Sequence, residues 1–233
     1  MNHPSDSDFI VSADGHILEP MDLFRTRLPK HLRERGVWEE DFEVEPLVEG
    51  GARVFRKLHT AGYEGWTISR YRQTSGRTPE GDPEHIIEDL ASDGVDAAVM
   101  HPNLSLFGLY SDDHELSMAH ARVYNDYVIE RFSPYLDRIV PTAPVPITDI
   151  GEAVAEIERV GAAGFKAILL PAIPPKPYYL REWDPIWEAI VGIGAGGVRR
   201  TARGGGPGAG SRDRWRAPPE PRGDRDSCAS RGA

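Results

Sequence analysis

The stretch VSADGHILEP, residues 11–20, begins like a buried strand and ends in side chains that can bind a metal ion. Residues 9–13 predict a short apolar strand, and Asp14, His16 and Glu19 follow it closely. Successive side chains of a strand point to opposite faces, so Asp14 and His16 are expected on the same side. A strand end of this kind can offer a carboxylate and an imidazole to one cation.

Three further apolar segments predict strands, and an amphipathic helix is expected between each strand and the next. The predicted strands cover residues 95–100, 138–145 and 165–171. They are rich in Val, Ile and Ala on both faces, which is typical of parallel strands covered by helices on both sides. The sequence therefore predicts an α/β fold. Residues 37–80 show no clear period and are interpreted as a long insertion after the first strand.

Aspartate residues mark the expected starts of the helices. Asp82 is followed by proline, and Asp112 and Asp149 each have a glutamate three positions later, which is the spacing of a capping box. A fourth helix is expected to begin at Asp184, with Val191 on its inward face.

Composition limits the classes of function. The 233 residues are 39% apolar, which is enough for one sizeable domain, and the net charge of −10 argues against a nucleic-acid partner. No run of about 18 apolar residues and no secretory leader is evident, so we expect a cytoplasmic protein that does not contact a membrane. The single cysteine, Cys228, rules out a cysteine-based zinc cluster, so any metal would be held by histidines and carboxylates.

The composition changes at Gly194. Residues 195–233 contain no Leu, Ile, Phe, Met or Tyr and cannot bury enough apolar area to fold, so we expect a domain over 8–194 and a disordered Gly/Arg/Pro-rich tail over 195–233. The tail is either a natural basic extension or the product of a reading-frame shift in a GC-rich gene. Reading the coding DNA in its other frames after codon 194 distinguishes the two.

Several segments, in order, resemble the first half of the amidohydrolase-related family, which includes aminocarboxymuconate semialdehyde decarboxylase-like and resorcylate decarboxylase-like enzymes. The segments are VSADGHILEPMDLF (11–24), DPEHIIEDLASDGVDAAVMHPN (82–103), ARVYNDYVIERFSPYLDRIVPTAPVPITD (121–149), GFKAILLPAIPP (164–175) and WDPIWEAI (183–190). The resemblance implies a (β/α)₈ TIM-type barrel, of which about four parallel β/α units are expected here.

The resemblance also implies a divalent ion, zinc or manganese, at the carboxyl ends of the strands. Asp14 and His16 take the positions of the family's first-strand ligands, where the commoner pattern is His-x-His. The family's other ligands come from later strands, and no histidine follows His120 in this chain, so the ion is expected to be held weakly.

Glu19, His101 and Asn103 are the candidate substrate-binding residues. Glu19 could instead complete the ligand set, orient His16 or fix the Glu19-Pro20 turn, and loop carbonyls could satisfy His101. His101 and Asn103 follow the second predicted strand, at the edge where barrel sites lie.

The implied function is that of a metal-dependent hydrolase or carboxy-lyase, meaning a non-oxidative decarboxylase, acting on a small carboxylated or cyclic molecule. We expect this activity to be impaired without the later strands, and the catalytic residues stay unassigned. The alternative is a truncated, non-catalytic fragment or interaction module. A homo-oligomer formed through the exposed barrel edge would shield the open half of such a fold.

Overall fold

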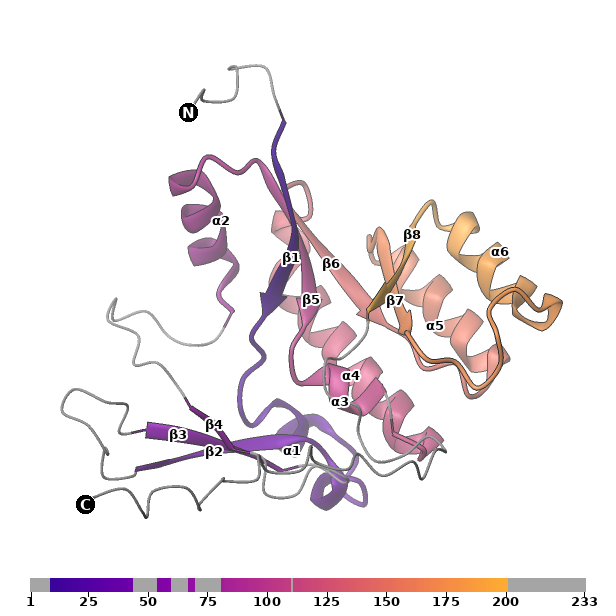
Figure 1. Cartoon of the computed structure of the whole chain (residues 1–233), viewed down its shortest axis with the longest axis horizontal. Helices are drawn as coiled ribbons and strands as arrows, with labels where there is room; N and C mark the ends of the chain where they lie inside the picture. Colours follow the sequence, from indigo (N-terminus) through magenta and orange to yellow (C-terminus); the bar gives the residue numbers. More distant parts are fainter. Residues whose placement is uncertain (1–8, 44–53, 60–66, 70–80, 110, 201–233) are drawn as a thin grey trace, which may run out of the picture.

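Two separate sheets make up the strand content of the computed structural model, which describes residues 9–43, 54–59, 67–69, 81–109 and 111–200 (Figure 1). The larger sheet has five strands in the order β1-β5-β6-β7-β8, and every neighbouring pair is parallel. The smaller sheet, β2-β3-β4, is antiparallel. Helices alternate with the parallel strands, so the predicted α/β class and partial barrel are confirmed.

The bounds of the elements follow the sequence patterns closely in the second half of the chain. The parallel strands are β1 (Val11–Ile17), β5 (Ala97–Pro102), β6 (Ile139–Pro144), β7 (Ala167–Pro171) and β8 (Gly196–Arg200). The antiparallel strands are β2 (Trp38–Glu43), β3 (Val54–His59) and β4 (Thr67–Ser69). The α-helices are α1 (Leu23–Arg27), α2 (Pro83–Ser92), α3 (Ser105–Leu109), α4 (His114–Phe132), α5 (Ile150–Ala162) and α6 (Asp184–Gly192). Short 3₁₀ turns are η1 (Arg33–Arg35), η2 (Ser133–Tyr135) and η3 (Arg181–Trp183).

Aspartate side chains cap three of the long helices. The carboxylates of Asp82 and Asp149 accept hydrogen bonds from backbone N–H groups of α2 and α5, as the sequence predicts. The prediction for α4 is wrong by one residue, because Asp113 rather than Asp112 accepts from the N–H of Leu116, at 3.1 Å. Asp113 is the residue with extended backbone, and it therefore sets the helix start.

The core lies between the parallel sheet and the long helices. Its largest fully buried side chains come from the strands and the turns beside them, from α4 and α5, and from the α1 region: Tyr124, Phe24, Phe132, Phe165, Ile17, Leu28, Leu32, Leu104, Ile139, Ile157 and Ile168. Ile190 of α6 is also buried, but Val191 is 76% exposed, so the predicted inward face of α6 is wrong at that residue. At 100° per residue, neighbouring positions on a helix cannot both be central to one face.

A buried carboxylate joins α4 to α5. Glu156 is 1% exposed and accepts hydrogen bonds from the side-chain amide of Asn125, at 2.7 Å, and from the guanidinium of Arg159, at 2.8 Å. Arg159 also pairs with Asp126, and the two carboxylates raise its pKa above the ordinary arginine value. These hydrogen bonds and the positive charge of Arg159 offset the free-energy cost of burying the Glu156 carboxylate.

Two parts of the fold differ from the sequence-based expectation. The tail was expected from residue 195, but residues 196–200 form β8, which pairs in parallel with all of β7. The proposed disorder of residues 201–233 lies outside the described residues. The insertion over 37–80 contains the antiparallel sheet, which the sequence does not predict. In the described part of the chain, no helix has the length and apolar character needed to cross a membrane.

Candidate functional site

The carboxyl ends of β1 and β5 lie next to each other, and the predicted site residues gather there. The strands pair in parallel, with His16 opposite His101 and Ile17 opposite Pro102. Residues directly opposite each other in neighbouring strands project from the same face of a sheet. His16 and His101 therefore share a face, and their ring centroids are 6.2 Å apart in an edge-to-face arrangement.

Asp14 lies in an irregular part of β1. The register with β5 shifts between Ser12 and Gly15, where β1 has one residue more than its partner, and both Ala13 and Asp14 are exposed. A bulge of this kind interrupts the regular alternation of side chains. The strand register therefore places His16 beside His101, whereas the shared face expected for Asp14 and His16 stays a prediction.

Both imidazoles are held through Nδ1. The Nδ1 of His16, a half-buried residue, lies 3.1 Å from the carbonyl oxygen of Pro102. His101 is 4% exposed, and its Nδ1 lies 3.1 Å from Oγ1 of Thr142 in β6. The hydroxyl of Thr142 in turn lies 3.4 Å from the carbonyl oxygen of Met100. Three adjacent strands thus fix the orientation of the two rings.

The carboxylate of Glu19 is an anchor for the loop after β5. Glu19 is 3% exposed and accepts hydrogen bonds from the backbone N–H groups of Asn103, Leu104 and Ser105, at 2.9 to 3.2 Å. Burial raises the pKa of Glu19 to about 7, while these N–H donors act in the opposite direction. The observed contacts fix the loop after β5, a role that the sequence does not predict. Metal binding by Glu19, orientation of His16 by Glu19 and contact of Glu19 with a substrate stay predictions.

Asn103 is bound to this anchor through its backbone, and its side chain is half-buried. It begins the turn that leads from β5 into α3. Asn103 is therefore located at the rim of the same strand ends as His16 and His101. The structure brings His16, His101, Asn103 and Glu19 together. Contact of Asn103 with a substrate stays a prediction.

His120 is a buried titratable residue that the sequence does not single out. Its ring stacks on Phe24 at 4.4 Å between centroids, and its Nε2 accepts a hydrogen bond from the N–H of Val37 at 3.3 Å. Burial lowers the pKa of His120 to about 4, so the ring is neutral near pH 7. Its partners lie more than 80 positions away in the sequence, which is why no local pattern reveals it.

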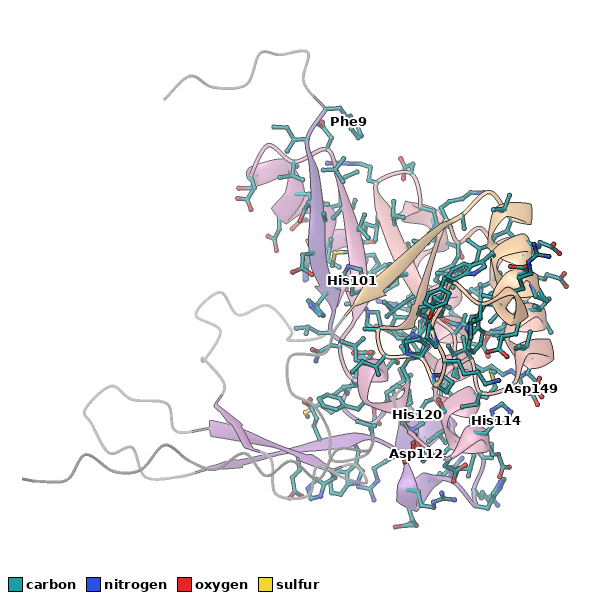
Figure 2. All side chains as sticks on the ribbon, turned by 45° about the vertical axis from the view of Figure 1, so that its right-hand side comes forward. Phe9, His101, Asp112, His114, His120 and Asp149 are labelled. Atoms are coloured by element: carbon teal, nitrogen blue, oxygen red, sulfur yellow. The ribbon has the colours of Figure 1, made fainter. Side chains whose placement is uncertain are left out.

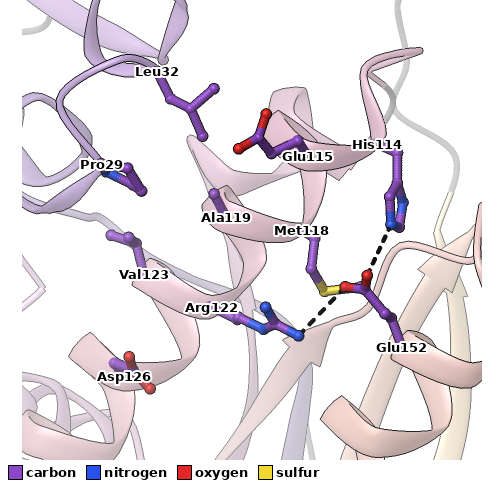
Figure 3. Close-up of a pocket in the computed structure, with 10 residues that line it drawn as sticks. All are labelled: Pro29, Leu32, His114, Glu115, Met118, Ala119, Arg122, Val123, Asp126 and Glu152. Atoms are coloured by element: carbon purple, nitrogen blue, oxygen red, sulfur yellow. Dashed lines mark hydrogen bonds and ion pairs between the residues drawn. The ribbon is translucent and has the colours of Figure 1, made fainter.

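A surface cavity of about 410 Å³ lies elsewhere, along α4 (Figure 3). Its floor is apolar, with Leu32, Met118 and Val123, and its charged rim includes Arg122 and Glu152, which pair with each other. None of the predicted site residues lines this cavity. Figure 2 shows His101 on the parallel sheet, apart from His114 and Asp149 at the starts of α4 and α5.

The residues present fit a metal ion only in part. A histidine ligand commonly donates its second ring N–H to a carbonyl or carboxylate, as His16 does to Pro102. Among the described residues, however, no three His, Cys, Asp or Glu side chains form a cluster that could hold an ion. Within the described part of the chain, His16 is therefore oriented as a ligand would be, but a complete set of metal ligands is not formed.

Comparison with known proteins supports the fold but not a specific activity. No protein-family model matches the chain, and no curated protein matches it either. An amidohydrolase from Mycobacterium avium subsp. paratuberculosis K-10 superposes with a TM-score of 0.57 and 20% identity, over 84% of this chain and 60% of that protein. This chain therefore spans less than two thirds of the length of that amidohydrolase.

Two decarboxylase structures are similar at a lower level. One is a 2,6-dihydroxybenzoate decarboxylase from Rhizobium, with a TM-score of 0.48 and 16% identity over 82% of this chain and 49% of that one. The other is a manganese-bound 5-carboxyvanillate decarboxylase from Novosphingobium aromaticivorans, with a TM-score of 0.48 and 16% identity over 83% and 51%. The superposition on the mycobacterial protein shows that this chain shares the fold of part of that structure.

Proposed function

We propose that this chain is a metal-dependent hydrolase or non-oxidative decarboxylase of the amidohydrolase type, acting on a small carboxylated or cyclic molecule. One observation carries the proposal: the parallel strands β1 and β5 bring His16 and His101 side by side at their carboxyl ends. In parallel α/β barrels this edge is where catalytic residues gather. The amidohydrolase type of fold makes the same edge the expected location of a metal ion.

Asp14 and His16 are the residues that would hold the ion, which we propose to be zinc or manganese. When bound, such an ion polarises a substrate oxygen or activates water. The Pro102 carbonyl orients the His16 ring, and the Glu19 carboxylate holds the turn that carries Asn103 at the rim. Asn103 is the proposed contact for the polar part of a substrate. With so few protein ligands in this chain, we expect weak metal binding and low activity.

Metal content and turnover test this proposal directly. The purified chain, loaded with zinc or manganese, is expected to bind the ion in stoichiometric amount and to convert a hydroxybenzoate carboxylate or a cyclic ester slowly. Asp14→Asn is expected to lower metal affinity at least about tenfold, since it removes the charged oxygen ligand. Asp93→Asn, at an exposed position after α2, is the matched control and should change nothing. Stoichiometric binding that survives Asp14→Asn, without turnover, would contradict the proposal.

A second candidate function is an interaction module that uses the edge of β1. Within the described residues β1 pairs only with β5, so its other side is an open strand edge. The apolar residues Val11, in β1, and Phe9, just before β1, are 47% and 73% exposed. Exposed strand edges with apolar side chains favour association with another chain. A second copy of this chain is the proposed partner.

Light scattering after size-exclusion chromatography distinguishes this candidate from the first. If β1 mediates self-association, the chain is expected to elute as an oligomer, and Val11→Lys is expected to make it monomeric by placing a charge on the edge. Val191→Lys, which places the same charge on the exposed side of α6, is expected to leave the oligomer intact. A monomeric wild-type chain, or an oligomer that is unchanged by Val11→Lys, argues against the edge as an interface.

A further inference from the structure

We propose that Thr148, His114 and Glu152 form a separate catalytic site, which hydrolyses small esters by transfer of the acyl group to Thr148. The three side chains are a hydroxyl, an imidazole and a carboxylate in series, here called the relay. The relay lies at the starts of α4 and α5 and requires no ion. The inference therefore goes beyond the metal-dependent function proposed for the ends of β1 and β5 and does not rest on it.

The contacts of His114 define the relay. Its Nδ1 is hydrogen-bonded to the hydroxyl of Thr148. Its Nε2 lies 3.4 Å from Oε1 of Glu152, and the guanidinium of Arg122 lies 3.5 Å from the other oxygen of this carboxylate (Figure 3). Nucleophilic sites in proteins have this arrangement, in which a hydroxyl contacts a base and a third group orients the base.

The proton positions in the relay follow from the Glu152 carboxylate. An ionised carboxylate can only accept a hydrogen bond, so the neutral His114 ring is expected to carry its proton on Nε2, which faces Glu152. The lone pair of the ring is then on Nδ1, and the Thr148 hydroxyl donates to it. His114 is therefore in position to remove the hydroxyl proton of Thr148 as a general base.

Two capped helix starts position the relay. His114 is the first residue of α4 and follows the cap Asp113. Glu152 is in the first turn of α5, and its N–H donates to the side chain of the cap Asp149 at 2.8 Å. Thr148 directly precedes this cap in the sequence. The side chains of the relay thus extend from backbone that is held by hydrogen bonds at both helix starts.

The cavity along α4 offers a place for the acyl part of a substrate. His114 and Glu152 line this cavity of about 410 Å³, whose apolar floor includes Met118 and Val123 (Figure 3). Small-molecule sites commonly have a volume of this order and combine apolar walls with a few polar groups. Thr148 lies outside the cavity lining, but it is exposed and is bonded to His114. A short acyl chain on the apolar floor would place its ester group beside His114.

The proposed reaction has two steps. In the first, Oγ1 of Thr148 attacks the carbonyl carbon of the ester, Nδ1 of His114 takes the hydroxyl proton, and the alcohol leaves with that proton. In the second, water attacks the acyl carbon, His114 takes a proton from the water and passes it to Oγ1 of Thr148, and the carboxylic acid is released. Glu152 is a positioning residue, which orients the imidazole and stabilises its charged form in both steps.

Hydrolysis of 4-nitrophenyl butyrate by the full chain, in the presence of a metal chelator, tests the proposal. Thr148→Val and His114→Gln are each expected to lower the rate at least about tenfold, which is below the roughly 10²- to 10⁴-fold typical of general bases because the relay is partly exposed. Thr148→Ser keeps a hydroxyl and is expected to retain activity. Glu152→Gln is expected to lower kcat with little change in KM. Mass spectrometry after acid quenching should locate a butyryl group on Thr148.

Two control variants match these changes. Thr26→Val removes an exposed hydroxyl that bonds to backbone carbonyls, and His31→Gln removes an exposed imidazole that pairs with Glu115. Both should hydrolyse the ester as the wild-type chain does.

Several results would overturn the relay as a catalytic site. These are a rate no higher than that of free imidazole, a rate that Thr148→Val leaves unchanged, and butyryl groups only on other residues. Activity that the chelator abolishes would also overturn it and would favour the metal-dependent function instead. Loss of activity in Thr148→Val, with activity retained in Thr148→Ser, supports the relay even if His114→Gln fails to fold.

Discussion

Replacing Glu19 by alanine is expected to lower the free energy of unfolding by about 3–5 kcal/mol. The carboxylate accepts hydrogen bonds from three successive backbone N–H groups, of Asn103, Leu104 and Ser105, and it is almost completely buried. Alanine leaves these donors without an acceptor, and each unsatisfied buried donor costs about 1–3 kcal/mol. The loss should be concentrated in the turn between β5 and α3.

Denaturant unfolding monitored by circular dichroism measures this effect. Glu158→Ala, at an exposed position of α5, is the control and is expected to change the free energy of unfolding by less than about 0.5 kcal/mol. Glu19→Gln keeps one acceptor oxygen and should give an intermediate loss. Faster amide exchange at Asn103, Leu104 and Ser105 in Glu19→Ala would locate the change. A loss below about 1 kcal/mol for Glu19→Ala would show that the carboxylate does not hold this turn.

Acidification is expected to destabilise the protein through His120. The pKa of this imidazole is about 4 in the folded chain, against an ordinary value of 6.5. Between these values the unfolded chain binds a proton that the folded chain does not, so stability rises with pH across this window. The contribution is fully present above pH 6.5 and is lost as the pH falls toward 4. The loss amounts to about 3 kcal/mol, from 1.36 kcal/mol per pKa unit.

The difference in stability between the wild-type chain and His120→Gln isolates this effect, because the other titrating groups are common to both. Glutamine does not titrate and keeps an acceptor for the N–H of Val37. The difference in the free energy of unfolding should be constant above pH 6.5 and shrink as the pH falls to 4. His85→Gln removes a histidine in α2 that is not fully buried and serves as the control. Parallel pH profiles for wild type and His120→Gln would rule out a neutral buried imidazole.

Local signals predicted most of the parallel part of the fold. The cap at Asp149 and the proline after Asp82 act within one helical turn, so the sequence alone could locate the starts of α5 and α2. The left-handed backbone at Gly164, with φ of +104°, is equally local and explains why a glycine ends the α5 segment. Asp112 and Asp113 are adjacent, and either could cap α4. The three-residue spacing to Glu115 favoured Asp112, whereas Asp113 caps the helix in the structure.

The elements that sequence analysis missed depend on contacts between distant residues. β8 has the sequence GGVRR, with one apolar residue and low strand propensity, yet it pairs with β7 along its whole length. Backbone hydrogen bonding to an exposed strand edge needs no apolar pattern. The antiparallel sheet after η1 likewise has strands without clear alternation, such as WEEDFE in β2.

The candidate site was predicted in its location but not in its contacts. The apolar strand before His16 and the one before His101 placed both imidazoles at carboxyl ends, and parallel pairing then brought them together. The partners of Glu19 are 84 to 86 positions away and are backbone groups, which leave no trace in the side-chain pattern. The bulge near Asp14 was also unforeseen, because it arises from the register with β5.

The ring nitrogens of His16 provide the most direct test of the proposed metal site at the carboxyl end of β1. Long-range ¹H–¹⁵N spectra of the histidine side chains report which nitrogen of each ring carries the proton. We predict that the His16 ring carries its proton on Nδ1, which lies 3.1 Å from the carbonyl oxygen of Pro102, and that zinc shifts the Nε2 signal of His16 but not that of the exposed His31. A proton on Nε2 of His16, or an Nε2 signal of His16 that does not change when zinc is added, would contradict the proposed metal site.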